Sequence, residues 1–265
     1  MSAPLPLRGR RVLVTRPEGQ AAGLMEGIQA LGGAAAHIPL LAIEATAATP
    51  ALTQIAAQLA HYRAVIFISA NAVRIAWPTL IRLQATGWPS NVAAAAVGPG
   101  TARELKSLGV SQVVVPESRF DSEGLLAEAF FAEQACREQS FALIRGEGGR
   151  DFLAPSLRAR GARVDEAAVY RRSLHPRALS RLEDWLAGGD ATDTLLISSS
   201  ESLQRVMAAA TPMLAARLHS LCLVVPHPRI AEAARELGFA RVAVSDGGDA
   251  GLLAHLQSYN QTQLS

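Results

Sequence analysis

Serine hydroxyls that follow apolar segments are the first groups in this sequence whose type and position could do chemistry. Ser69 and the run from Ser198 to Ser200 both stand where many α/β enzymes carry a nucleophile. The G-x-S-x-G pattern that exposes such a serine is absent, and no histidine is spaced as its base. We therefore expect these serines to cap helices rather than to attack a substrate.

Two glycine-rich segments are the next candidates, because backbone N–H groups in such loops can bind phosphate. They are R-G-E-G-G-R, from Arg145 to Arg150, and V-G-P-G-T, from Val97 to Thr101. Neither contains the Gly-Lys-Ser/Thr of a P-loop or the complete G-x-G-x-x-G fingerprint. The sequence therefore does not favour a nucleotide-binding protein.

Composition excludes several further classes. The 265 residues are 49% hydrophobic with a formal net charge of +2, enough for two α/β cores but without the basic tract of a nucleic-acid groove. Cys136 and Cys222 lack the spacing of metal ligands, so we expect reduced thiols and no metal site. There is no signal-peptide pattern and no apolar run of membrane-helix length, which favours a cytoplasmic protein without a membrane or nucleic-acid partner.

The elements that would position these groups are indicated by short apolar runs that alternate with helical patterns. This alternation is typical of parallel sheets covered by helices, so the predicted fold class is α/β. Gly32-Gly33 and Gly109 are expected to end helices, and Asp121 and Asp249 to begin them as N-caps. The predicted strands are Arg11 to Thr15, Ala64 to Ile68, Val92 to Val97, Gln112 to Val115, Phe141 to Arg145, Thr194 to Ile197, Leu221 to Val225 and Arg241 to Val244.

An internal duplication organises these elements. A shift of 129 residues places Arg16 on Arg145, and Ile68-Ser69 on Ile197-Ser198. Two copies are too few for a solenoid, so the duplication predicts two similar domains with a ligand cleft between them.

Two extended segments, His37 to Ala45 and Arg163 to Ser173, correspond to one another under the same shift. Neither leads by a short turn into a glycine-rich loop, so we interpret them as crossovers between domains. The predicted domains are residues 1–37 with 174–265, and residues 46–162. Residues 38–45 and 163–173 are the predicted linker strands.

Short motifs in a fixed order cover nearly the whole chain. They are V-T-R-P-E (14–18), F-I-S-A-N-A-V (67–73), V-G-P-G-T-A (97–102), R-G-E-G-G-R (145–150), V-Y-R-R (169–172), I-S-S-S (197–200) and P-R-I-A-E-A-A-R-E-L-G-F (228–239). No single motif is specific, but their order and spacing together resemble the uroporphyrinogen-III synthase family.

This resemblance implies two α/β domains joined by a two-stranded antiparallel linker. It also implies an enzyme, a lyase, that closes the linear tetrapyrrole hydroxymethylbilane into uroporphyrinogen III, with loss of water and inversion of the terminal pyrrole ring. Such enzymes serve haem, sirohaem and cobalamin biosynthesis without metal or organic cofactor, and a monomer is expected. A transient hand-over from the enzyme that makes hydroxymethylbilane is a further expectation. Positioning of the substrate should supply most of the catalysis.

The implied substrate carries eight carboxylates, which helix N-termini and arginines can bind. The turns between strands and helices therefore supply the candidate substrate-binding residues, which are Arg16, Ser69, Asn71, Thr101, Arg145, Arg150, Ser198, Ser200, His227 and Arg229.

Tyr170 is the candidate catalytic residue, because it matches a tyrosine that the family uses beside the substrate. Its phenol could donate a proton or hydrogen bond to the leaving hydroxyl; alternatively, it packs the linker. Thr101 matches a family threonine, with helix capping as its alternative. Two features depart from the family pattern, namely V-P-H-P-R in the second copy and the arginines Arg171 and Arg172 after Tyr170.

Two other classes compete with this hypothesis. A non-catalytic protein with two α/β lobes could close on an anionic small molecule, although a secreted version should carry a signal peptide. A glycosyl transferase derived from the same fold would need an acidic pair for its nucleotide sugar, which we do not find. An assay with hydroxymethylbilane discriminates among the three.

Overall fold

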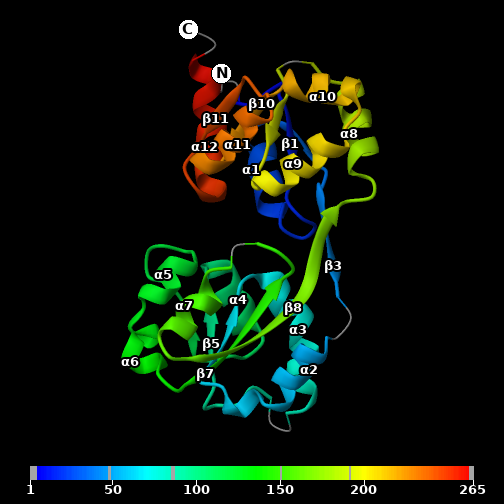
Figure 1. Cartoon of the computed structure of the whole chain (residues 1–265). Helices are drawn as coiled ribbons and strands as arrows, with labels where there is room; N and C mark the ends of the chain where they lie inside the picture. The colour runs from blue at the N-terminus through cyan, green and yellow to red at the C-terminus, as the bar shows by residue number, and fades with distance from the viewer. Residues whose placement is uncertain (1–4, 47–48, 85–86, 150, 191, 263–265) are drawn as a thin grey trace. The chain divides into compact units, whose positions relative to one another are not determined.

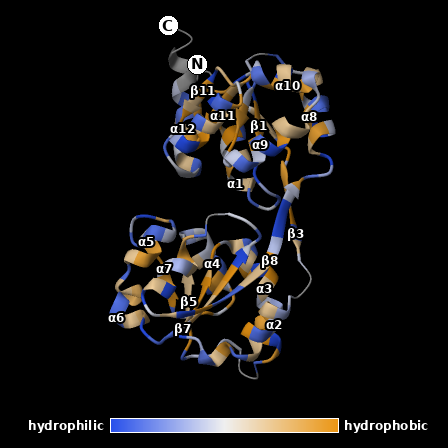
Figure 2. Ribbon diagram, in the orientation of Figure 1, coloured by the Kyte–Doolittle hydropathy of each residue, from blue (hydrophilic) through white to orange (hydrophobic). Residues whose placement is uncertain are grey.

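The computed structural model describes residues 5–46, 49–84, 87–149, 151–190 and 192–262. The chain divides into two compact units. Unit 1 comprises residues 1–42 and 173–265, and unit 2 comprises residues 43–172. Each unit contains a sheet whose hydrophobic strands are covered by helices (Figures 1 and 2).

Unit 1 is built on a five-stranded sheet in the order β11-β10-β9-β1-β2, in which the paired strands run parallel. Alternate residues of β1 serve two cores: Leu13 packs with α8 to α11, whereas Val12 and Val14 pack with α1 and α12. The strands are β1 (Arg11–Val14), β2 (Ala34–His37), β9 (Thr194–Leu196), β10 (Cys222–Val225) and β11 (Val242–Val244). The helices are α1 (Ala22–Ala30), α8 (Ala178–Ala187), α9 (Ser200–Ala209), α10 (Pro212–His219), α11 (Pro228–Glu236) and α12 (Gly248–Thr262).

Unit 2 is built on a six-stranded sheet in the order β3-β8-β7-β4-β5-β6. One face packs against α2, α3 and α4, and the other against α5 to α7. The strands are β3 (Leu41–Ala45), β4 (Ala64–Phe67), β5 (Ala93–Ala96), β6 (Val113–Val114), β7 (Ser140–Gly146) and β8 (Arg163–Leu174). The helices are α2 (Pro50–Ala57), α3 (Ala70–Arg82), α4 (Pro99–Ser107), α5 (Ser122–Ala127), α6 (Glu133–Cys136) and α7 (Leu153–Ala159), with short 3-10 turns at Leu59–His61 and Ala129–Phe131.

Strands β3 and β8 pair in the opposite sense to the rest of their sheet. The N–H of Thr46 donates to the carbonyl of Val169, and the N–H of His175 donates to that of Leu40. The residue numbers rise along one strand as they fall along the other, so the pair is antiparallel. Residues 163–170 also pair in parallel with β7. The sequence pattern indicated only a crossover for this segment and did not predict that pairing.

The predicted α/β class is confirmed, and each predicted strand coincides with an observed one to within a few residues. Strand β2 was not predicted, because A-A-A-H has no strand-like alternation. Asp121 caps α5 as predicted, accepting the N–H of Gly124 at 2.9 Å. Asp249 is not an N-cap: α12 begins at Gly248, and Asp249 lies within its first turn.

The duplication extends to the elements themselves. Under the 129-residue shift, β5 coincides with β10, and α4 coincides with α11. The copies differ at their extended segments, since β2 and β3 are separate strands whereas β8 is continuous. Pro39 lies in the gap between β2 and β3 and has no N–H to donate to a sheet, whereas the corresponding residue of β8 is Ala168. Among the residues that the structure describes, no helix is long and apolar enough to cross a membrane.

Candidate functional site

Most of the predicted site residues of unit 2 lie at the carboxyl ends of its parallel strands. Because β4, β5 and β7 are parallel neighbours, the turns that follow them lie at one edge of the sheet. Ser69 and Asn71 lie at the start of α3, after β4. Thr101 lies in the first turn of α4, after β5, and is 6% exposed. Its predicted alternative as a helix cap is wrong, because Gly98 is the N-cap residue of α4.

The hydroxyl groups of Tyr170 and Ser69 contact one another at this edge. The Tyr170 hydroxyl lies 3.0 Å from Ser69 Oγ, and Ser69 Oγ accepts the N–H of Ala72 at 3.1 Å as the N-cap of α3. Tyr170 is 2% exposed, so its ring is packed in the core of unit 2 while its hydroxyl reaches a helix N-terminus. Ser69 thus has the capping role predicted for it, and it also fixes the phenol.

Gly146, the last residue of β7, makes room for the ring of Tyr170. A Cβ at position 146 would lie 2.6 Å from both Cε2 and Cζ of Tyr170, closer than any real contact. The ladder between β7 and β8 is irregular at Arg145 and Gly146, where the N–H of Glu147 donates to the carbonyl of Tyr170 at 2.7 Å. The absence of a side chain at residue 146 therefore allows the ring to seat, a requirement that the sequence motif did not reveal.

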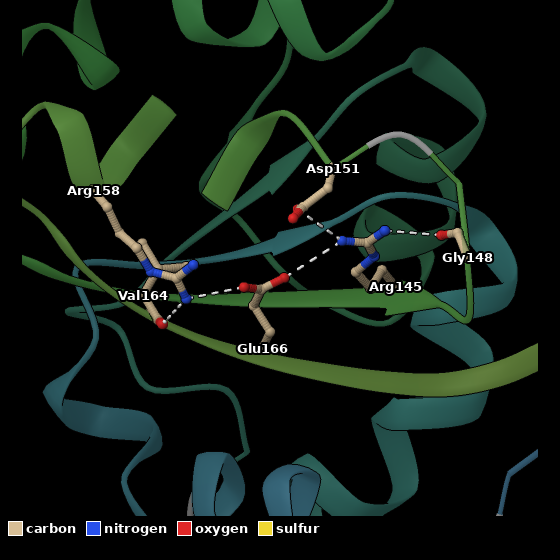
Figure 3. Close-up of polar contacts among 6 residues, drawn as sticks. All are labelled: Arg145, Gly148, Asp151, Arg158, Val164 and Glu166. Carbon is tan, nitrogen blue, oxygen red and sulfur yellow. Dashed lines mark hydrogen bonds and ion pairs between the residues drawn. The ribbon is translucent and has the colours of Figure 1, made fainter. Parts of the chain in front are cut away.

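Arg145 is held by acidic neighbours (Figure 3). Its Nη1 lies 3.2 Å from Asp151 Oδ1 and 3.4 Å from Glu166 Oε2, and its Nη2 donates to the carbonyl of Gly148 at 2.8 Å. Glu166 also accepts from Arg158 at 2.9 Å. The guanidinium therefore connects residues 146–149, which we call the glycine loop, to β8. The positive charge of Arg145 is balanced by its acidic neighbours.

The predicted residues of unit 1 also lie at the carboxyl ends of parallel strands. Arg16 follows β1 and forms an ion pair of 2.5 Å with Asp249, while its carbonyl lies 2.8 Å from His37 Nε2. Ser198 and Ser200 follow β9, but the residue that caps α9 is Ser199, which accepts the N–H of Ser202. The capping prediction is therefore confirmed for Ser199, whereas Ser198 precedes the cap and Ser200 is the first residue of α9.

His227 has a local role that the sequence did not indicate. It is the N-cap of α11, and its Nδ1 accepts the N–H of Arg229 at 3.1 Å. Both residues are exposed in the turn that corresponds to Gly98 and Gly100 of the first copy. Arg150, the remaining predicted residue, lies outside the described residues.

The charged groups at the two edges do not form a recognisable metal site. Within the described ranges, no group of three or more histidine, cysteine, aspartate or glutamate side chains is placed to hold a metal ion. Each edge instead combines helix N-termini with arginines. The fold and these edges define a two-unit α/β protein whose strand-end turns carry groups of the type that can bind anions.

Comparisons with known proteins identify the family. The model of the family described as "Uroporphyrinogen-III synthase HemD" matches residues 22–253. The chain is 31% identical to the uroporphyrinogen-III synthase of Salmonella typhimurium over 240 residues, covering 90% of this chain and 96% of that protein. The Escherichia coli enzyme of the same name is 30% identical over 241 residues, with 90% and 96% coverage. This chain belongs to the uroporphyrinogen-III synthase family.

Solved structures agree on the fold. The crystal structure of uroporphyrinogen-III synthetase from Helicobacter pylori superposes with a TM-score of 0.61 at 14% identity, covering 98% of this chain and all of that one. A mutant uroporphyrinogen III synthase from Thermus thermophilus gives 0.58 at 20% identity, with coverage of 96% and 100%.

Proposed function

We propose that this chain is a lyase that converts hydroxymethylbilane into uroporphyrinogen III, with loss of water and inversion of the terminal pyrrole ring, in tetrapyrrole biosynthesis. The observation that carries the proposal is the family match over residues 22–253, together with 31% identity to a synthase along 90% of the chain. The arrangement of Tyr170, Ser69 and the arginine-bearing turns supports it.

Tyr170 and Ser69 can supply the proton that the first step needs. The two hydroxyls carry two hydrogens, and their mutual hydrogen bond of 3.0 Å uses one of them. Ser69 Oγ is also an acceptor for Ala72 N–H, so the second hydrogen is available to an oxygen of the substrate. A hydrogen bond to the departing hydroxyl helps it leave as water. An electrophilic azafulvene remains.

The later steps need control of conformation more than acid or base strength. The terminal ring attacks the azafulvene carbon through its substituted α carbon, giving a spiro intermediate that fragments and recloses at the unsubstituted α carbon on the other side of the ring nitrogen. Loss of a proton from the carbon that forms the last bond restores the pyrrole, so the proton donated at the start is balanced. Because free hydroxymethylbilane closes without inversion, the protein must hold the chain in the conformation that allows spiro attack.

The protein can hold hydroxymethylbilane in this conformation by binding its carboxylates. In our proposal they bind Arg16, Arg145, Arg150 and Arg229 and the backbone N–H groups that begin α3, α4, α9 and α11. Ser69, Asn71, Thr101, Ser198, Ser200 and His227 stand at those helix starts. Arg145 and Arg16 already have acidic partners, so a substrate carboxylate would compete with Asp151 or Asp249 for them.

We also propose domains of residues 1–37 with 174–265 and of residues 46–162, joined by linker strands 38–45 and 163–173. We propose a cytoplasmic monomer that needs no cofactor and receives hydroxymethylbilane directly from the enzyme that makes it. The antiparallel contacts of β3 with β8 support the linker.

The test is an assay with freshly made hydroxymethylbilane, followed by oxidation and chromatographic separation of the type I and type III porphyrins. We expect the type III isomer to dominate with the protein and the type I isomer without it. A product mixture identical to the spontaneous one would contradict the proposed activity. Saturable binding of the bilane without formation of type III would instead indicate the non-catalytic alternative.

A further inference from the structure

A hollow of about 180 Å³ opens beside the glycine loop of unit 2. Its lining contains one group of apolar side chains and one group of polar or cationic groups. The lining residues are Ile68, Ser122, Leu143, Arg145, Gly146, Gly148, Gly149, Leu153 and Arg172. Neither Ser122 nor Arg172 was among the residues predicted to bind substrate.

Arg172 is the cationic residue of this hollow that lies closest in sequence to Tyr170. It lies two residues beyond Tyr170 on β8, and its guanidinium carbon is 5.8 Å from the centroid of the Tyr170 ring. Gly146 lines the hollow and also contacts that ring, so the hollow adjoins the Tyr170 site. Tyr170 itself packs in the core on the other face of the sheet, so the hollow and the Tyr170 ring are linked through Gly146 and Arg172 rather than by direct contact.

The neighbouring Arg171 has a different environment. Successive side chains of a strand point to opposite faces, and Arg171 is an exposed residue whose Nη2 lies 2.7 Å from Glu44 Oε2. Arg171 is not part of the lining of the hollow. The two adjacent arginines thus provide a matched pair, one in the hollow and one outside it.

The lining is complementary to a short arm that ends in a carboxylate, rather than to a bare anion. Ile68, Leu143 and Leu153 offer apolar surface that methylene groups can cover, while the guanidiniums of Arg145 and Arg172 suit a carboxylate. Gly148 and Gly149 have φ values of 68° and 82°, a backbone course that only glycine adopts readily, and Arg145 fixes this loop through the Gly148 carbonyl. The hollow exceeds the room needed by one water molecule many times over.

We propose that this hollow binds one carboxyalkyl arm of the substrate, with Arg172 as a binding residue for its carboxylate and the apolar floor in contact with its methylene groups. The proposal rests on the proposed function for the identity of the whole ligand, because the tetrapyrrole supplies acetate and propionate arms. Arg172 then fixes the register of the ring that carries this arm relative to Tyr170.

The experiment compares Arg172→Met with Arg171→Met, since methionine keeps part of the apolar stem while removing the charge. Two quantities are measured for the full chain: the KM for hydroxymethylbilane in formation of the type III isomer, and the Kd of uroporphyrin III from its fluorescence. Arg172→Met should raise both by about 10-fold or more, the effect of one lost charge-assisted contact. Arg171→Met should change them less than 2-fold, and Arg172→Lys should recover part of the loss. Urea unfolding establishes that each variant is folded.

The outcomes separate this inference from the proposed function. If the unmodified protein forms the type III isomer but Arg172→Met changes KM and Kd no more than Arg171→Met does, the subsite is wrong and the activity stands. If Arg172→Met lowers kcat alone, Arg172 positions Tyr170 rather than binding an arm, which also overturns the subsite. If no type III isomer forms, the proposed activity is wrong. The subsite is then tested by the Kd of uroporphyrin III alone. If Arg172→Met fails to fold, Arg172→Gln and Arg172→Lys are compared, and equal Kd values for the two overturn the proposal.

Discussion

Substitution of Gly146 by alanine should damage both the fold of unit 2 and the proposed catalysis through a single contact. Gly146 is not among the glycines with positive φ, so alanine introduces no backbone strain there. Its Cβ would lie 2.6 Å from two ring carbons of Tyr170 and 3.0 Å from the phenol oxygen. Ordinary contacts between carbon atoms are about 3.5 to 4.0 Å, so the ring must move by roughly 1 Å.

The movement has a cost that can be estimated. Tyr170 is only 2% exposed, so the ring displaces core neighbours rather than swinging into solvent. Overpacking of this kind costs about 1 to 3 kcal/mol, and a buried hydroxyl deprived of Ser69 costs about 1 to 3 kcal/mol more. The type III rate should fall about 100-fold, because the phenol no longer stands where it is needed.

Urea unfolding of unit 2 and the hydroxymethylbilane assay measure the two effects. Gly109→Ala is the control, because it strains a left-handed residue (φ 86°) whose added Cβ would meet no other atom within 4 Å. It should cost about 1 kcal/mol of stability and leave the rate unchanged. In a Tyr170→Ala background the alanine at 146 should cost little, giving a coupling free energy of about 2 to 6 kcal/mol, nearly the whole cost of the single substitution. Normal stability and rate in Gly146→Ala would refute the reasoning.

Three further results are expected. Tyr170→Phe removes the 3.0 Å contact with Ser69 and should slow type III formation about 10- to 100-fold, at a stability cost of about 1 kcal/mol in urea unfolding; an unchanged rate would remove the phenol from the mechanism. Asp151→Asn removes one competitor for Arg145, so steady-state kinetics should show a KM about 2- to 5-fold lower with stability altered by less than about 1 kcal/mol, and a higher KM would count against Arg145 as a substrate ligand. Desolvation raises the pKa of Asp193 above its ordinary value, with Arg11 opposing the shift, so its contribution to stability is fully present below the ordinary pKa and declines as pH rises through the raised one. The stability of the unmodified protein minus that of Asp193→Asn should therefore decrease as the pH rises above the ordinary aspartate pKa of about 4, and the opposite slope would show that the attraction of Arg11 dominates.

The strands were predictable because their signals are local. Runs such as Arg11 to Thr15 and Leu221 to Val225 are apolar, and glycines such as Gly109 end the helices between them. Strand β2 escaped prediction, since Ala34 to His37 carries no alternation and is a strand only by pairing with β1. The extended segment from Arg163 was recognised, but its pairing with β7 depends on contacts between distant residues.

The turns that carry the candidate site were predictable for a related reason, because parallel strands deliver all of them to one edge of a sheet. The contacts that the side chains in these turns make were less predictable. Arg16 appears in the sequence as an available cation, yet its partner Asp249 lies near the other end of the chain. The fit of Tyr170 against Gly146 depends on a bulge in the ladder, and the cap at His227 on a side-chain rotamer. Long-range pairing and close packing of this kind leave no periodic signal in the sequence.

The construction of unit 1 from both ends of the chain determines the order in which the protein can assemble on the ribosome. Strand β1 is synthesised first, but one of its two sheet neighbours is β9, at Thr194–Leu196. At 5 to 20 residues per second, roughly 10 to 40 s pass before that neighbour emerges, and all of residues 43–172 are made in the interval. Unit 2 can therefore fold while β1 still has an open edge. The early part of unit 1 is the segment of the nascent chain that most needs protection from aggregation.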